Sequence, residues 1–79
     1  MNSAYHRLYR TLGINIAYYR NMKDMSQEQL GERLEIDQSH VSKIERASIG
    51  ISMDMLCDIA KELGVEPYLL LKPKDLKGK

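Results

Sequence analysis

The chain has 79 residues, 43% of them apolar, and its 12 basic and 11 acidic residues leave a net charge of only +1. A chain this short forms one domain with a thin core, which leaves little room for both a catalytic pocket and a substrate site. The single Cys57 excludes an internal disulfide, no cysteine–histidine spacing fits a zinc site, and no apolar run approaches the length of a membrane span. We therefore expect a soluble, cytoplasmic protein without a metal or cofactor, and bulk charge alone would not bind it to nucleic acid.

Apolar residues recur at helical spacing nearly throughout the chain, which predicts an all-α fold. A first helix covers roughly residues 5–22, and its apolar stripe consists of Leu8, Leu12, Ile16 and Tyr19. Gly13 is a weak point inside this helix, because glycine is a poor helix former. A second, short helix covers about Gln27–Leu34, since Ser26 is a good N-cap residue and Gln29 completes a capping box with it.

Three further helices are predicted towards the C-terminus. The third covers Gln38–Arg46 and is followed by a loop. The fourth begins after Ser52 and ends at Gly64, and its inner face consists of Met53, Leu56, Ile59, Ala60 and Leu63. Proline suits the first turn of a short fifth helix, Pro67–Leu71, and the last six or so residues are expected to form a mobile tail.

The second and third helices carry the packing pattern of a helix-turn-helix, with three residues between them. Counting Gln27 as position one, apolar residues fall at positions four, eight, ten, fifteen and eighteen, which are Leu30, Leu34, Ile36, Val41 and Ile44. The smallest residue, Gly31, falls at position five, where the backbones of two steeply crossing helices meet. These six positions together, with caps before both helices, predict this motif.

Residues 26–46 read SQEQLGERLEIDQSHVSKIER, which resembles the DNA-binding domain of phage repressors, Cro proteins and the Xre-type bacterial regulators. The resemblance extends upstream over Leu12 to Arg20 and downstream over LCDIAKELGV (residues 56–65) and the pair Leu69-Leu70. It implies a compact five-helix bundle of the lambda-repressor-like type. It also divides the chain into an N-terminal extension (1–7), a helix-turn-helix domain (8–71) and a basic C-terminal tail (72–79).

The sequence departs from the family pattern at four positions. Alanine is common in the family at Gly31, glycine at Glu35 and Ala47, and proline at Ile51. Glu35 matters most, because a positive φ in this turn would strain any residue with a side chain. The shape of the turn is therefore the feature that the resemblance leaves open.

Outward side chains of a recognition helix meet base edges in the major groove of DNA. With Val41 and Ile44 buried, the outward residues of the third helix are Gln38, Ser39, His40, Ser42, Lys43 and Arg46. Glutamine can bond adenine at two atoms, and lysine can reach two acceptors of guanine. The resemblance implies that Gln38, Ser39 and Lys43 contact bases, and Ser42 is a fourth candidate.

The expected phosphate contacts are Ser26, Gln27, His40 and Arg46. In the family, the residue matching Gln27 bonds a phosphate and braces the first residue of the recognition helix. Ser26 is a cap that can also touch phosphate. His40 has three interpretations, as a phosphate contact, as a base contact or as a solvated side chain. The resemblance further implies that Arg20 and Glu45 form a structural ion pair between the first and third helices.

One recognition helix reads few base pairs, so we expect a homodimer on an inverted repeat, with half-sites about one turn of DNA apart. The candidates for the dimer contact are Ile49, Ile51, Tyr68, Leu69 and Leu71. The leading function is a transcriptional regulator, most simply a repressor of its own operon. The alternative is an antitoxin or a restriction-modification controller that depends on a partner protein. No nucleophile–base pair or phosphate loop supports an enzyme.

Charge is distributed unevenly. Residues 1–23 contain four basic residues and no acidic one, whereas the fourth helix has an acidic stripe that is a candidate contact for RNA polymerase, formed by Asp54, Asp58 and Glu62. An extension that reaches DNA is one interpretation of residues 1–7. Tyr5 and Tyr9 could pack on the fifth helix, line a dimer contact or reach the sugar-phosphate backbone. Cys57 and the five methionines are expected to fill the core.

Overall fold

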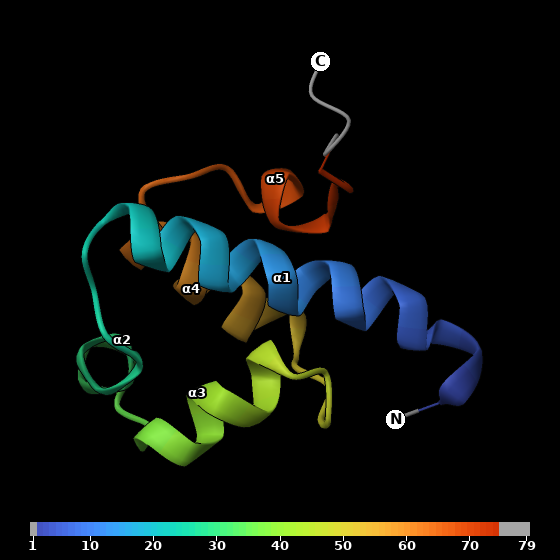
Figure 1. Cartoon of the computed structure of the whole chain (residues 1–79), viewed down its shortest axis with the longest axis horizontal. Helices are drawn as coiled ribbons and strands as arrows, with labels where there is room; N and C mark the ends of the chain where they lie inside the picture. The colour runs from blue at the N-terminus through green and yellow to red at the C-terminus, as the bar shows by residue number, and fades with distance from the viewer. Residues whose placement is uncertain (1, 75–79) are drawn as a thin grey trace.

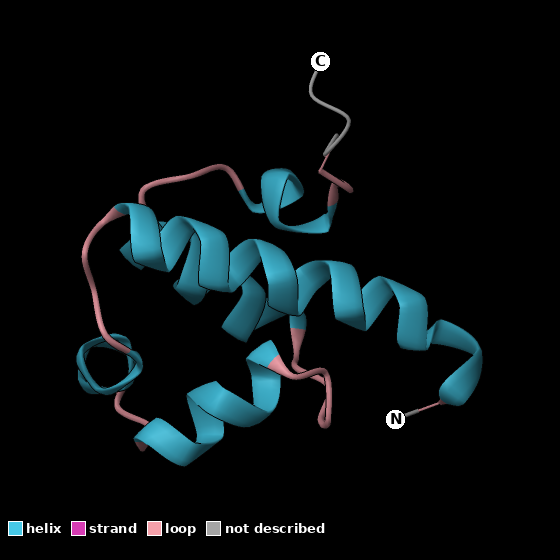
Figure 2. Cartoon of the chain, viewed as in Figure 1, coloured by secondary structure: helices cyan, strands magenta, loops and turns pink. Residues whose placement is uncertain are grey.

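N-terminal caps and positive-φ turns divide the chain into five α-helices over residues 2–74, the part that the computed structural model describes. The elements are a short 3-10 turn, η1 (Ser3–Tyr5), and the helices α1 (His6–Met22), α2 (Gln27–Leu34), α3 (Gln38–Glu45), α4 (Met53–Leu63) and α5 (Pro67–Leu71). No strand occurs in these residues, so the predicted all-α fold is confirmed (Figure 2). None of these helices combines the length and apolar character needed to cross a bilayer.

Helix α1 is the central element of the bundle (Figure 1). It packs against α5 on one side and α3 on the other, and it also contacts α4. Helices α2 and α3 pack on each other, and α4 contacts both α2 and α5. The helix-turn-helix therefore rests on α1 and α4, which fix its orientation relative to the rest of the domain.

The helix starts are set by side chains that cap free backbone N–H groups. The Ser26 hydroxyl accepts a hydrogen bond from the Gln29 backbone N–H (3.0 Å), and the Gln29 side chain accepts one from the Ser26 N–H (2.8 Å), which is the predicted capping box. Ser52 caps α4 in the same way, accepting from the Met55 N–H at 3.0 Å. Because these bonds join neighbours in the chain, the sequence predicts them well.

Three residues with side chains adopt a positive φ at or just after the end of a helix, and Asp24, which follows α1, is the first of them (φ 55°). Glu35 has a φ of 62° and Ala47 a φ of 61°, and these are the two positions at which the resembling family has glycine. A side chain in this region costs about 1 kcal/mol, so both turns reduce the stability of the fold slightly. Helix α3 ends one residue earlier than predicted, because Arg46 leaves the helical region as its C-cap. Gly64, with a φ of 71°, ends α4 as expected.

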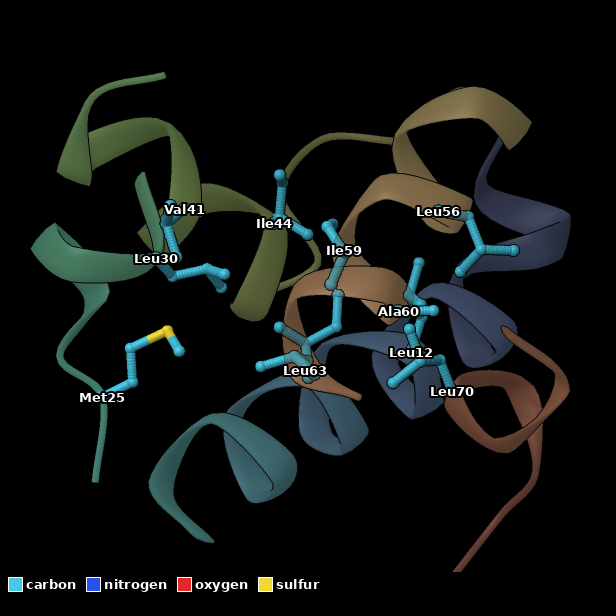
Figure 3. Close-up of a cluster of buried hydrophobic side chains, with 11 residues drawn as sticks. Leu12, Met25, Leu30, Val41, Ile44, Leu56, Ile59, Ala60, Leu63 and Leu70 are labelled. Atoms are coloured by element: carbon cyan, nitrogen blue, oxygen red, sulfur yellow. The ribbon is translucent and has the colours of Figure 1, made fainter. Parts of the chain in front are cut away.

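The core is one cluster of apolar side chains from all five helices and the loop before α2 (Figure 3). Its most buried members are Leu12, Ile16, Met25, Leu30, Val41, Ile44, Leu56, Ile59, Ala60, Leu63 and Leu70. The helix-turn-helix supplies Leu30, Val41 and Ile44 to this cluster. The burial of these residues fixes which side chains of α3 face outward.

Several apolar residues predicted for the core are instead exposed. Leu8 is 49% exposed, because the first turns of α1 extend past the elements that cover its later turns. Met53 (69%) and Met22 (64%) are exposed because each occupies an end position of its helix. Cys57 is exposed because it lies beside the buried stripe of α4 and not in it. Helical spacing predicts on which face of a helix a residue lies, but it does not predict how much of that face other helices cover.

Asn15 is a buried polar residue that the sequence analysis did not single out. Its side chain is 1% exposed, and its Nδ2 donates to the backbone carbonyls of Leu69, Leu70 and Lys72 at 3.2, 2.9 and 2.8 Å. These carbonyls end α5 and would otherwise lack partners. Asn15 therefore closes the last turn of α5 and attaches it to α1.

The chain after α5 begins on the surface of α1. The Lys74 ammonium lies 3.7 Å from the centre of the Tyr18 ring and 4.5 Å from that of Tyr19, which are cation–π distances. The remainder of the predicted tail, 75–79, lies outside the described residues.

Candidate nucleic-acid interface

The N-terminal ends of α2 and α3 and the outward side of α3 form one polar surface. Gln38, Ser39 and Lys43 are exposed on α3, and Ser42 is half-buried beside them. Ser26 and Gln27 begin α2 next to this row. Gln27 and Gln38 are joined by a hydrogen bond, so the two helix starts form a single surface.

A chain of hydrogen bonds runs from this surface to the interior. Gln38 Nε2 donates to Gln27 Oε1 at 2.6 Å, and Gln27 Nε2 donates to Glu45 Oε1 at 2.9 Å. Arg20 holds the same carboxylate with two bonds, from Nε to Oε2 (2.7 Å) and from Nη2 to Oε1 (3.1 Å). Arg20 Nη1 also donates to the Met25 carbonyl at 2.8 Å.

This network fixes the first residue of α3 relative to α1. The side chains of Arg20 and Glu45 are only 11% and 7% exposed, so the ion pair is largely shielded from water. A two-point guanidinium–carboxylate pair has a defined orientation, and here it holds Glu45 where Gln27 can bond it. Gln38 thus starts α3 with its side-chain carbonyl oxygen left for another partner.

Asp37 caps α3 and sets the position of Ser39. Its Oδ1 accepts from the His40 backbone N–H (2.9 Å) and from the Ser39 hydroxyl (3.0 Å). The His40 backbone bond, then the Ser39 bond and the nearby His40 and Lys43 charges, lower the pKa of Asp37 from its usual 3.8. The Ser39 hydroxyl donates to Asp37 and keeps its lone pairs for an N–H donor on a base.

We expect the Asp37 cap to make stability depend on pH. Because the folded state lowers the pKa of Asp37, the unfolded state binds more protons, and the stabilisation is complete above about pH 4 and lost as pH falls through the folded pKa. Asp37→Asn keeps an acceptor but cannot titrate. Urea unfolding from about pH 5 to about pH 2.5 should show the wild type losing its advantage over Asp37→Asn. A stability difference that does not change with pH would contradict this cause.

The other residues proposed from the sequence lie around the same surface. Arg46 is exposed at the end of α3, where its Nε donates to the Ser42 carbonyl at 3.3 Å, and His40 is half-buried. The dimer candidates lie elsewhere. Tyr68 is 64% exposed, whereas Ile49, Ile51 and Leu71 are partly buried against the core, and Leu69 is half-buried.

The turn after α3 is held by bonds that the sequence analysis missed. The Ser48 backbone N–H and hydroxyl both donate to the Lys43 carbonyl, at 3.0 and 3.1 Å. They satisfy a carbonyl in the last turn of α3 and bring the chain back across the helix end. The only sequence feature that could have indicated these bonds is the position of Ser48, two residues after the C-cap Arg46. Among residues 2–74, no group of three histidine, cysteine or acidic side chains is placed to bind a metal.

The comparison with protein families decides what this arrangement is. Residues 16–70 match the family model described as "Helix-turn-helix", which spans more than half of the chain. The chain belongs to the Xre-like helix-turn-helix family. This regulator family was the resemblance inferred from residues 26–46, and that prediction is confirmed.

Individual relatives agree with this assignment. The regulator is 31% identical over 67 residues to the control protein C.SmaI of Serratia marcescens, covering 85% of this chain and 80% of that protein. The solved structure of the hypothetical transcription factor NHTF from Neisseria has a TM-score of 0.82 at 33% identity, covering 89% of this chain and 80% of that one. The restriction-modification controller C.AhdI from Aeromonas hydrophila has a TM-score of 0.74 at 29% identity, with coverages of 78% and 94%. The chain is thus a helix-turn-helix transcriptional regulator.

Proposed function

We propose that this regulator binds a specific double-stranded DNA operator in the cytoplasm as a homodimer and represses its own operon. The observation that carries the proposal is the braced start of α3, where the 2.6 Å bond from Gln38 to Gln27 continues through Glu45 to Arg20. Base readout needs side chains held in a defined geometry. In this interface Gln38 is held by that chain, and Lys43 is exposed with no acidic partner among the described residues.

Each side chain of the surface then has a separate role. Gln38, Ser39, Ser42 and Lys43 face base edges in the major groove, while Ser26, Gln27, His40 and Arg46 bind the phosphate backbone and fix the register. Gln27 has two roles in this arrangement, since it braces Gln38 and begins α2, whose free N–H groups favour a phosphate. The ion pair of Arg20 and Glu45 supports readout without touching DNA.

An exposed apolar area supports the homodimer. A shallow apolar hollow between α1, α4 and α5 is lined by Leu8, Ile51, Met53 and Leu71 among others, and Tyr68 is exposed on α5. Isolated exposed apolar residues are ordinary, but a contiguous group on so small a domain is typical of a contact between copies. With two-fold symmetry, two copies of α3 would read an inverted repeat.

The proposal is tested by fluorescence anisotropy on DNA from upstream of the gene and on random DNA, at several salt concentrations. We expect Gln38→Ala/Lys43→Ala to lose about 100-fold of its affinity for the operator while keeping the weak affinity for random DNA. Lys61→Ala, which removes an exposed cation from α4, is the matched control. Two chains should bind each inverted repeat.

Equal, weak binding of wild type and variant to both DNAs would contradict base readout by α3. A monomer at micromolar concentration that fills half-sites independently would contradict the homodimer.

A second candidate function is control of a restriction-modification system, and the similarity to C.SmaI and C.AhdI favours it. Such a role would keep the same DNA site and could add activation through a partner such as RNA polymerase. The acidic stripe of α4 is available for that contact, since Asp54 and Asp58 are exposed and Glu62 pairs only loosely with Arg33 at 3.6 Å. A restriction endonuclease gene beside this one would favour the controller, and a small toxin gene would favour the antitoxin alternative.

A further inference from the structure

The first turns of α1 carry cations that the helix-turn-helix does not use. Arg7 and Arg10 are both exposed, and residues 1–23 contain no acidic residue that could neutralise them locally. The ion pairs formed among residues 2–74 are Arg20–Glu45 and Arg33–Glu62, so neither of these arginines has an acidic partner there. The segment is therefore a positive surface outside the proposed base-reading row.

Close contacts place these turns beside the end of α3. A Cβ atom at Gly13 would lie 2.8 Å from the Glu45 carbonyl carbon and 3.0 Å from the Ile44 carbonyl oxygen, so α1 crosses the C-terminal end of α3 at this residue. One turn earlier, the Tyr9 hydroxyl lies against Gly50 in the following loop, 3.1 Å from where a Cβ would be. In Figure 1 the N-terminal end of α1 and this loop lie on the same side of the molecule.

Helical spacing shows which cations face the loop. His6 and Arg10 precede Gly13 by seven and three residues, so all three share one side of α1. That side extends beyond the end of α3 along the loop that begins with the exposed Arg46. We call the two arginines, Arg10 and Arg46, the cationic strip, and His6 lies beside it on α1. Arg7 lies about 100° round the helix from His6 and is not part of it.

We propose that the cationic strip follows one DNA backbone, and that Arg10 is the principal ligand of a phosphate beyond those contacted by α2, α3 and Arg46. The inference rests on the proposed function, because the loop after α3 must approach the operator. A guanidinium matches the oxygens of a phosphate with paired hydrogen bonds. The strip continues the polar surface of α3 through Arg46, so one DNA backbone could follow both.

The placement of charge in α1 points to an anion as the occupant. The first turn of α1 contains Arg7 and no acidic residue, although acidic side chains are the ones that stabilise this end of a helix, and Arg10 adds a second cation in the next turn. Cations at a helix N-terminus are unfavourable in the isolated protein, and an approaching phosphate would reverse this effect.

The test measures the salt dependence of binding for wild type, Arg10→Ala, Arg10→Lys and the control Lys61→Ala, on operator and on random DNA. Each phosphate contact contributes about 0.9 to the slope of log K against log salt. We expect Arg10→Ala to lower the slope by about 1 and to weaken binding to both DNAs several-fold, with an unchanged ratio between them. Arg10→Lys and Lys61→Ala should keep the wild-type slope. In ethylation interference, one phosphate outside the half-site should matter to the wild type and not to Arg10→Ala.

An Arg10→Ala protein with the wild-type slope and interference pattern would overturn the proposal and leave the strip for an acidic protein partner. That outcome is distinct from failure of the proposed function, in which the wild type would not prefer the operator over random DNA. A circular dichroism spectrum and unfolding midpoint equal to those of the wild type would show that Arg10→Ala is folded, which the exposure of Arg10 leads us to expect.

Discussion

Replacing Gly13 by alanine is expected to lower the free energy of unfolding by about 2–3 kcal/mol. A Cβ at this position would overlap the Glu45 carbonyl oxygen and lie 2.8 Å from its carbonyl carbon. These are backbone atoms at the end of α3, so no side-chain rotation can relieve the overlap, and α1 and α3 must move apart. The same movement would displace the recognition helix, and operator affinity should fall as well. Urea unfolding gives the change in stability.

Gly50→Ala is the matched control, because its new Cβ would meet only the Tyr9 side chain, at 3.1–3.2 Å, and this side chain can shift. We expect its effect to stay within about 1 kcal/mol. Helix propensity alone makes the opposite prediction for Gly13, since alanine favours a helix interior over glycine by about 1 kcal/mol. A Gly13→Ala protein more stable than the wild type would show that the two backbones are not in close contact.

The contrast between these two predictions shows what the sequence can and cannot determine. The helices, the capping box of Ser26 and the stop at Gly64 were predicted closely, because they depend on neighbours within a few residues. Gly13 was interpreted only as a weak point of its helix. Its close approach to α3 was not predicted, because it depends on Glu45, far along the chain. Asn15 was missed for the same reason, as its partners are carbonyls at the end of α5, far along the chain.

In the candidate site, too, local features were predicted from the sequence and contacts between distant residues were not. The outward row of α3 follows from the burial of Val41 and Ile44, which the helical spacing predicts. The bond between Gln27 and Gln38 was expected only from the family resemblance, because no local rule joins residues eleven apart. The bond from Ser39 to Asp37 was not expected, although Asp37 before a helix is a cap signal. Which acceptor a serine hydroxyl bonds depends on the three-dimensional arrangement of its neighbours, and the sequence alone does not show it.

Replacing Glu45 by alanine is expected to destabilise the fold by about 3 kcal/mol, the usual effect of removing one partner from a largely buried ion pair. Arg20, only 11% exposed, would keep its charge without a carboxylate, and Gln27 would lose its acceptor. The matched control is Glu62→Ala, whose pair with Arg33 is longer (3.6 Å) and more exposed (57% and 30%). We expect that change to cost about 0.5 kcal/mol. Equal effects of the two substitutions would contradict the buried network.

A double-mutant cycle separates the pair from its surroundings. Arg20→Ala/Glu45→Ala should cost less than the sum of the single changes, since the double variant leaves no buried charge unpaired. The ability to distinguish operator from random DNA should not recover together with stability. Both Glu45→Ala and the double variant release Gln27 and therefore Gln38, so both should lose discrimination between operator and random DNA, even where the double variant regains stability. Recovery of stability without recovery of specificity would assign the network to positioning Gln38, whereas recovery of both would leave it a purely structural contact.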